Sequence, residues 1–317
     1  MTNYIIRRTA LAVITFFGIT ILVYFMSTLA PGSPLDALLA DPGMTKEEIA
    51  RRSAELGLDQ PVYIQYLSWL KEFLHGNMGF SYTSYRPVSD MITERIGATL
   101  SLTVTAILLS YLVGIPLGLI SALKPYSLRD YSVSTAAFVM TGVPGFFLGM
   151  ILIYIFAVKL KLLPFGGMYD SSGSNSIGVV IRHLILPAAA IAIPEIGKVM
   201  RHVRSNMLEV MNEDYVRTAR AKGVGESAVV IVHAFRNTLI PIVTVLSGSI
   251  PFMIGGSVVV EKVFGWPGLG TLMINSITSR DYPVIMGISV VIAIVVLVTN
   301  LLVDILYAYL DPRITYN

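Results

Sequence analysis

The chain has 317 residues, of which 54% are hydrophobic and only 14% are charged, and its formal net charge is +3. Soluble domains carry about 25% charged residues, whereas here charges are missing from five long blocks, at 9–35, 96–123, 131–158, 237–260 and 282–303. Because about 20 helical residues cross a bilayer core of about 30 Å, each block can span a membrane. The composition excludes a water-soluble enzyme, and it also excludes a transmembrane barrel, whose strands alternate over about ten residues.

The residue types that support catalysis or metal binding are scarce. The chain has no cysteine, which excludes disulfides, thiolate metal sites and cysteine nucleophiles. No G-x-x-x-x-G-K-[ST] pattern occurs, so the chain has no P-loop for ATP. The histidines are far apart in the sequence, which does not favour a zinc site; they are His75, His183, His202 and His233. We predict that the chain is not an enzyme, has no cofactor or metal of its own and does not bind nucleic acid.

The first apolar block resembles a signal peptide, because Thr28-Leu29-Ala30 is similar to a cleavage site. An apolar signal region has about 7–15 residues, however, and this block runs for 22 residues before Pro31. We predict an uncleaved first helix whose start, at Arg7 and Arg8, lies in the cytoplasm. The later blocks predict helices near 99–122, 133–158, 239–260 and 284–306.

A further helix over 177–200 decides the topology, although this stretch contains Arg182, Pro187, Pro194 and Glu195. Without it the chain has five spans and its ends lie on opposite sides; with it there are six, and both ends are cytoplasmic. The loop 198–238 has seven basic and four acidic residues, whereas the segment 36–95 has six basic and nine acidic ones. Since cytoplasmic loops are enriched in Lys and Arg, six helices are predicted.

Two hydrophilic segments separate the spans. The outer one, 31–97, begins with Pro31-Gly32-Ser33-Pro34 and contains amphipathic stretches at 46–56 and 62–74. It is either a solvated cap over the helices or a docking surface. The inner one, 198–238, is interrupted by Gly223 and Gly225, which predicts two helices with a break between them. A loop of this length in a compact protein is usually functional.

Ionisable and helix-breaking residues inside the spans bear on the kind of transport. Only Arg182, Glu195 and Asp304 are ionisable there, and all three lie near helix ends, which disfavours a proton-coupled carrier. Several glycines and prolines allow either close helix packing or a pathway whose helices rearrange; besides the two prolines of 177–200, they are Gly114, Pro116, Gly118, Gly142, Pro144, Gly145 and Gly149.

The segment 215–223 is a short basic stretch that ends in glycine. It is either solvated positive charge on the cytoplasmic side or a helix that inserts into a cytoplasmic partner. Its residues resemble the coupling motif E-A-A-x3-G of binding-protein-dependent ABC transporter permeases, in the form of the dipeptide and oligopeptide branch. Ala219 and Gly223 match the general motif, whereas Arg217 and Thr218 depart from it, as does the longer distance to 239–241. These departures are usual in the peptide branch.

Further motifs in the same order extend the resemblance over nearly the whole chain. They are 4–8 with 31–34, Leu56-Gly57-Leu58-Asp59-Gln60-Pro61 with Gln65-Tyr66, 76–81 (where Asn77 and Met78 depart slightly), Phe264-Gly265-Trp266-Pro267-Gly268-Leu269-Gly270 with Arg280-Asp281-Tyr282-Pro283, and 300–304 with Tyr307 and 311–313. The chain is similar to the first permease of a peptide importer pair. The resemblance implies an all-α membrane protein with six transmembrane helices and the type I ABC importer permease fold.

The resemblance also implies a division of the chain. Residues 1–30 hold the N-terminus and transmembrane helix 1, 31–94 form an extracellular segment, 95–306 form the ABC transmembrane type-1 domain with the coupling loop 198–238, and 307–317 form a cytoplasmic tail. The implied ATPase-coupling residues are Tyr215, Arg217, Thr218, Ala219, Arg220, Ala221, Lys222 and Gly223. The candidate contacts for a binding protein are Trp69, Phe264, Gly265 and Trp266.

The implied function is that of a cell-membrane permease subunit that forms half of the pathway of an ATP-driven importer of di- or oligopeptides. Its partners are a second homologous permease, two ATPases that bind ATP and Mg, and an extracellular solute-binding protein. Nickel or oligosaccharide permeases of the same family remain alternatives, as does a stand-alone carrier or channel. The cargo is not determined by the sequence.

Overall fold

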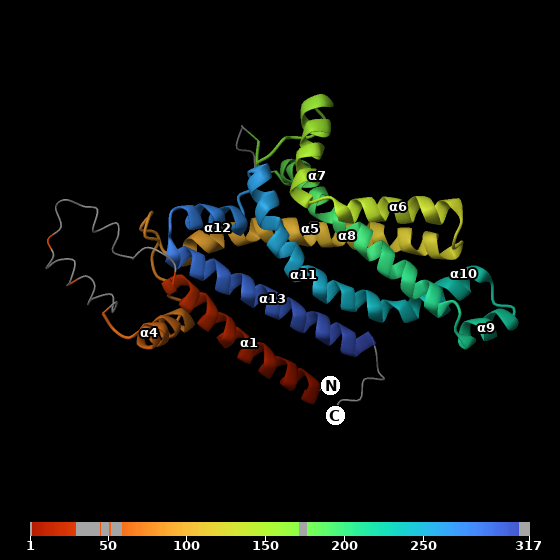
Figure 1. Ribbon diagram of the computed structural model, residues 1–317, viewed down its shortest axis with the longest axis horizontal. Helices are drawn as coiled ribbons and strands as arrows, with labels where there is room; N and C mark the ends of the chain where they lie inside the picture. Colours follow the sequence, from red (N-terminus) through yellow and green to blue (C-terminus); the bar gives the residue numbers. More distant parts are fainter. Residues whose placement is uncertain (1, 30–44, 46–50, 52–58, 171–175, 311–317) are drawn as a thin grey trace. The chain divides into compact units, whose positions relative to one another are not determined.

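The computed structural model (Figure 1) describes residues 2–29, 45, 51, 59–170 and 176–310. The predictions for 31–34, for 46–56 and for the tail beyond 310 lie outside these residues. The chain forms two compact units, which are described separately. Unit 1 comprises Met1–Arg8, Ala98–Thr271 and Val298–Asn317, and unit 2 comprises Thr9–Gly97 and Leu272–Leu297.

Five helices are long and apolar enough to span a membrane, and a bent pair provides a sixth span. The five are α1 (Thr2–Leu29), α5 (Val88–Leu123), α8 (Ile177–Val210), α11 (Arg236–Phe264) and α13 (Tyr282–Leu310). The pair consists of α6 (Leu128–Gly142) and α7 (Gly145–Leu152), and the latter continues as the π-helix η1 (Ile153–Lys159). The shorter elements are α4 (Val62–Leu74), α9 (Asp214–Ala221), α10 (Glu226–Ala228), the π-helix η2 (Val229–Phe235) and α12 (Leu269–Thr278). The described residues thus agree with the predicted all-α fold of six spans.

The prediction of one continuous helix over 133–158 is wrong, because α6 and α7 meet at an angle of 103°. Val143 has extended backbone angles, with φ −99° and ψ 126°. This conformation is favoured before proline, whose ring clashes with a helical preceding residue. Pro144 is the N-cap residue of α7, which begins at Gly145, and an N-cap residue needs no N–H for a bond within the helix. By contrast, Pro187 and Pro194 lie inside α8 without ending it.

Unit 1 is built around α8, which packs against α6, α7 and α11 (Figure 1). Glycines on α5 allow a close approach to α8: a Cβ on Gly114 would lie 2.9 Å from Val199, and one on Gly118 would lie 2.6 Å from the Cβ of Val203. Real Cβ atoms do not approach so closely, so these two glycines are required by packing. The sequence allowed either close helix packing or a pathway with rearranging helices, and at Gly114 and Gly118 the structure shows close packing.

Unit 2 contains the predicted amphipathic helix 62–74 as α4. One face of α4 carries Tyr66, Trp69 and Phe73, which stack with each other and with Tyr24 of α1 at ring-centroid distances of 5.5–6.2 Å. The Tyr66 hydroxyl also lies 3.1 Å from the hydroxyl of Thr20. Aromatic packing with a polar anchor therefore fixes α4 on α1.

Candidate functional site

The segment singled out by its sequence, 215–223, forms the helix α9 and its C-terminal cap. The N–H of Val224 donates to the carbonyl of Ala219 at 3.3 Å, and the N–H of Gly223 donates to the carbonyl of Arg220 at 3.0 Å. These two bonds form a Schellman motif, which requires a left-handed residue after the helix. Gly223 supplies it, with φ +78°. The glycine at this position therefore ends the helix.

The two faces of α9 have different surroundings. Val216 and Ala219, three residues apart, are buried against Val229 of η2, and Met211 and Val224 complete this apolar cluster. The opposite face is exposed to solvent; it carries Tyr215, Arg217, Thr218, Ala221 and Lys222. The inner face fixes α9 to its own chain, and the outer face is available to a partner.

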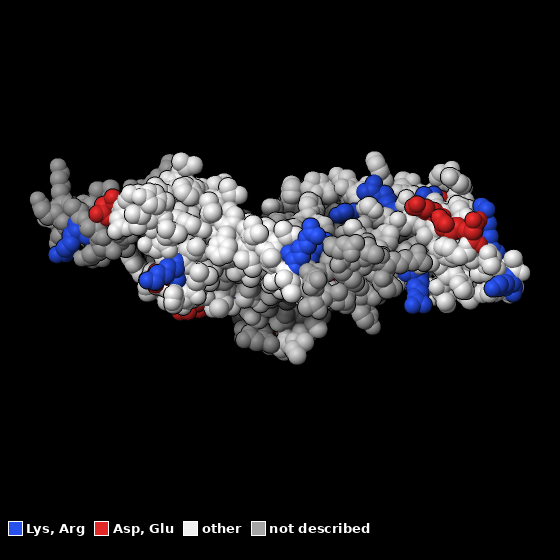
Figure 2. Space-filling view, turned by 90° about the horizontal axis from the view of Figure 1, so that it is seen from below, with Lys and Arg blue, Asp and Glu red and all other residues white. Residues whose placement is uncertain are grey.

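Two basic side chains of α9 form ion pairs with acidic residues of the same chain. The Arg220 guanidinium donates to both carboxylate oxygens of Glu226, at 2.7 and 3.2 Å, and this bond raises the pKa of Arg220. Arg217 forms a looser pair with Asp214 at 3.5 Å. Charged side chains gather in Figure 2 at the end of the molecule where Figure 1 places α9 and α10. Arg220 thus braces the loop, while Arg217 and Lys222 remain on its exposed side.

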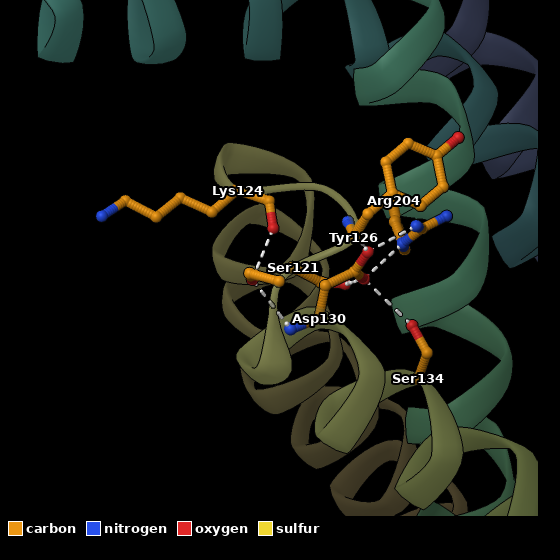
Figure 3. A network of polar contacts seen from close by, with 7 residues as sticks. Ser121, Lys124, Tyr126, Asp130, Ser134 and Arg204 are labelled. Atoms are coloured by element: carbon orange, nitrogen blue, oxygen red, sulfur yellow. Dashed lines mark hydrogen bonds and ion pairs between the residues drawn. The ribbon is translucent and has the colours of Figure 1, made fainter.

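A network around the buried carboxylate of Asp130 connects α5, α6 and α8 (Figure 3). Arg204 of α8 donates two hydrogen bonds to it, from Nε at 2.6 Å and from Nη2 at 2.7 Å. The N–H of Tyr126 donates at 2.8 Å, and the hydroxyls of Ser121 and Ser134 donate as well. A bidentate pair of arginine and carboxylate is among the strongest polar contacts in proteins. It ties the turn between α5 and α6 to α8, which leads directly into α9.

Sequence reasoning missed this network. Ser127 and Asp130 have the spacing of a helix N-cap, and the Ser127 side chain does accept from the N–H of Asp130. That local signal could have been found. Arg204, by contrast, was counted only as a positive charge of the loop 198–238, because its partner lies 74 residues away.

A second buried carboxylate, Glu261 of α11, organises the glycine-rich segment 264–271, which runs from the end of α11 into the first turn of α12. It accepts from the hydroxyl of Thr99 at 2.8 Å and from the N–H groups of Gly270 and Thr271 at 2.7 and 3.1 Å. A Cβ on Gly270 would lie 2.8 Å from this carboxylate. The glycine is therefore needed for the close approach of the backbone.

This packing corrects the expected binding-protein contacts in that segment. Trp266 is fully buried and its indole N–H donates to the carbonyl of Ala98 at 2.9 Å, while Phe264 is 2% exposed. Neither side chain offers a surface to a partner. Gly265 is exposed, and its φ of +59° caps α11. Trp69 is half-buried within the aromatic cluster of unit 2.

These features define a multi-span helical membrane protein with a braced polar helix, α9, in the connection between two spans. The chain belongs to the family of binding-protein-dependent transport system inner membrane components, whose model matches residues 114–316. The model of the N-terminal membrane component of such systems matches residues 1–103.

Similar proteins cover the full length of the chain. It is 43% identical to the oligopeptide transport system permease protein AppB of Bacillus subtilis, with 100% of both chains covered. It is 42% identical to a putative peptide permease protein of Brucella ovis (99% of both) and 36% identical to the dipeptide transport system permease protein DppB of Escherichia coli K12 (100% of both).

Among solved structures, the inward-facing MetNI methionine ABC transporter has a similar fold. The TM-score is 0.58 at 16% identity, and the match covers 70% of this chain and 96% of that chain. Together with the family assignment, this similarity confirms the predicted fold of a type I ABC importer permease.

Proposed function

We propose that this chain is the membrane subunit of an ATP-driven importer of di- or oligopeptides, and that α9 is its contact with an ATPase. The peptide cargo is supported by the names of the full-length relatives, which are oligopeptide and dipeptide permeases. Those relatives favour peptides over nickel or oligosaccharides. The proposed partners are a second permease, two ATPases and an extracellular solute-binding protein.

The observation that carries the ATPase contact is the two-sided packing of α9. Because Val216 and Ala219 are buried in the chain's own apolar cluster, α9 cannot move without moving Met211 and Val229, which flank it. Met211 follows α8 directly, and η2 leads into α11. A partner that displaces the exposed face therefore displaces the ends of two spans. In this way an ATPase that closes on ATP and Mg shifts the permease between two arrangements, and this chain supplies no chemistry of its own.

The proposed topology places both termini and the loop 198–238 in the cytoplasm and segment 31–94 outside. The domain 95–306 then carries the pathway, and 307–317 is a cytoplasmic tail. The charge distribution supports this orientation.

Cysteine cross-linking tests the ATPase contact, because the chain has no cysteine of its own. Two alanines of α9 form a matched pair: Ala221 is exposed and Ala219 is buried. In the assembled transporter, we expect Ala221→Cys to cross-link to an ATPase that carries cysteines on its permease-facing surface, and Ala219→Cys to react much less. Absence of cross-links from Ala221→Cys, in a complex that still takes up peptide, would refute the contact.

A further inference from the structure

A cavity of about 340 Å³ lies in unit 1 at the bend between α6 and α7. Its volume is within the range of about 300–1,000 Å³ that is usual for ligand pockets. The described residues that line it are mostly apolar, and Glu195 is the one charged side chain among them. They are Thr141, Gly142, Val143, Pro144, Gly145, Phe146, Ala190, Ile191, Pro194, Glu195, Phe252, Met253, Gly256, Val259 and Val260.

The polar lining residue Glu195 belongs to an ordered group of three side chains, of which it alone lines the cavity. Glu195 is 3% exposed and accepts a hydrogen bond from the hydroxyl of Ser249. The ammonium group of Lys198 lies 3.4 Å from the Glu195 carboxylate and donates to the same hydroxyl at 3.0 Å. One edge thus offers the Glu195 carboxylate, whose charge is partly balanced by Lys198, a residue outside the lining, while the walls offer apolar surface. This combination suits a molecule with charged or polar backbone groups and an apolar side chain, and it does not suit a sugar, which needs hydrogen-bond partners on all sides.

The cavity shares its walls with the helices that flank α9. Ala190, Ile191, Pro194 and Glu195 belong to α8, which runs on to Val210 and then to α9. Phe252 and Gly256 belong to α11, which follows η2, and η2 packs on α9. Any displacement of α9 is therefore transmitted along both helices toward this cavity. Such a position suits the cargo better than a lipid chain, because its shape is linked to the site that the ATPase moves.

From these observations we infer that the cavity receives an apolar side chain of the transported peptide. The inference rests on the proposed function, since it takes the cargo to be a peptide. It adds a place in the chain where the size of a cargo side chain is sensed during transport, after release from the binding protein.

Two neighbouring glycines of α11 allow a matched test. A Cβ on Gly256 or on Gly255 would meet no atom within 4 Å, so both positions tolerate a larger side chain locally. Gly256 lines the cavity, whereas Gly255 does not. Gly256→Leu therefore fills the cavity, and Gly255→Leu is its control for hydrophobic bulk on the same helix.

The measurement is uptake of trialanine and of Ala-Phe-Ala by proteoliposomes that hold the complete transporter, ATP and saturating binding protein. We expect Gly256→Leu to lower the ratio of Ala-Phe-Ala to trialanine uptake by about tenfold, because overfilling an apolar pocket discriminates against the bulkier group. Gly255→Leu should leave this ratio within about twofold of the wild type. Thermal unfolding of both variants shows whether they are equally folded.

An unchanged ratio in Gly256→Leu, with uptake of both peptides retained, would overturn the inference while leaving the proposed function intact. An equal loss of both peptides in Gly256→Leu, but not in Gly255→Leu, would also overturn it, and would indicate a cavity needed for helix movement or filled by lipid. If the wild-type transporter takes up neither peptide, the proposed peptide function fails, and this inference fails with it.

Discussion

Single buried carboxylates fix chain segments that are remote in the sequence. Asp130 binds Arg204, and Glu261 binds Thr99 together with the backbone N–H groups at the start of α12. A buried carboxylate that loses its donors carries a large free-energy cost. Each of these side chains therefore stabilises one local arrangement of helices. Neither residue is predicted to be important by the sequence motifs.

Asp130→Asn tests this role. We expect it to lower the free energy of unfolding by about 3 kcal/mol, because Arg204 loses its counter-charge in a site where the carboxylate is almost fully buried. The measurement is the thermal unfolding of the purified transporter in detergent. Ser134→Ala is the control: it removes one donor at 3.2 Å from the same carboxylate and should cost less than about 1.5 kcal/mol. Equal melting temperatures for the two variants would contradict the central role of the ion pair.

For single residues, the sequence predicts features that depend on near neighbours, such as helix caps, but not contacts between residues far apart in the chain. Gly223 was expected to end a helix, and its positive φ follows from the cap that it forms. The family resemblance predicts Trp266, in an aromatic and glycine-rich segment, as a contact for a binding protein. It is buried in the apolar core of unit 1, where its indole N–H donates to the carbonyl of Ala98, 168 residues away. No pattern within a short window reveals such a partner.

At the scale of elements, hydropathy located five of the spans and the charges of the loops decided the sixth, but neither signal located the ends or the bends of the helices. The predicted start of the second span near 99 is eleven residues late, because α5 begins at Val88 with polar turns that hydropathy does not detect. In the same way α8 continues to Val210, beyond the predicted end near 200. The glycines and Pro144 at 142–145 are compatible with close packing or with helices that rearrange, and neither interpretation predicts the 103° angle between α6 and α7.

The turn 76–87 in unit 2 is a further candidate contact for a binding protein, beside Trp69 and Gly265, because Phe264 and Trp266 are buried. The Asp281 carboxylate accepts from the N–H of Tyr82 at 3.0 Å and from the Thr83 hydroxyl at 2.9 Å, which holds the turn in place. Burial, together with the nearby Asp281 carboxylate, raises the pKa of Tyr82 to about 12, so this phenol stays neutral at physiological pH. Phe80 and Tyr85 project from the fixed turn and are 60% and 75% exposed.

We therefore expect a photo-crosslinking amino acid at Tyr85 to capture the solute-binding protein in the assembled transporter. Exposed aromatic side chains on a rigid turn are typical anchors of an interface. The same amino acid at Tyr63, which is 62% exposed on α4, serves as a control for exposure alone. Capture at Tyr63 and not at Tyr85, in a complex that transports, would move the contact to α4.

For the whole molecule, the orientation in the membrane is open to direct labelling of single cysteines in intact cells. Ser84 and Ser205 are both exposed. A membrane-impermeant maleimide added outside should react with Ser84→Cys and not with Ser205→Cys, because the proposed topology has loop 198–238 in the cytoplasm. After the cells are broken, both should react. Labelling of Ser205→Cys in intact cells would reverse the topology.

The two-sided packing of α9 also has a consequence for the evolution of transporters that carry this helix. Val216 and Ala219 are constrained by packing within the chain. Arg217, Thr218 and Lys222 are exposed, so they are constrained only by a subunit that binds there. Mutations on the outward side can accumulate without unfolding the permease, so a duplicated gene can acquire preference for a different ATPase through a few exposed positions. If the proposed contact holds, the residues that keep the fold and those that select the ATPase lie on opposite sides of one eight-residue helix.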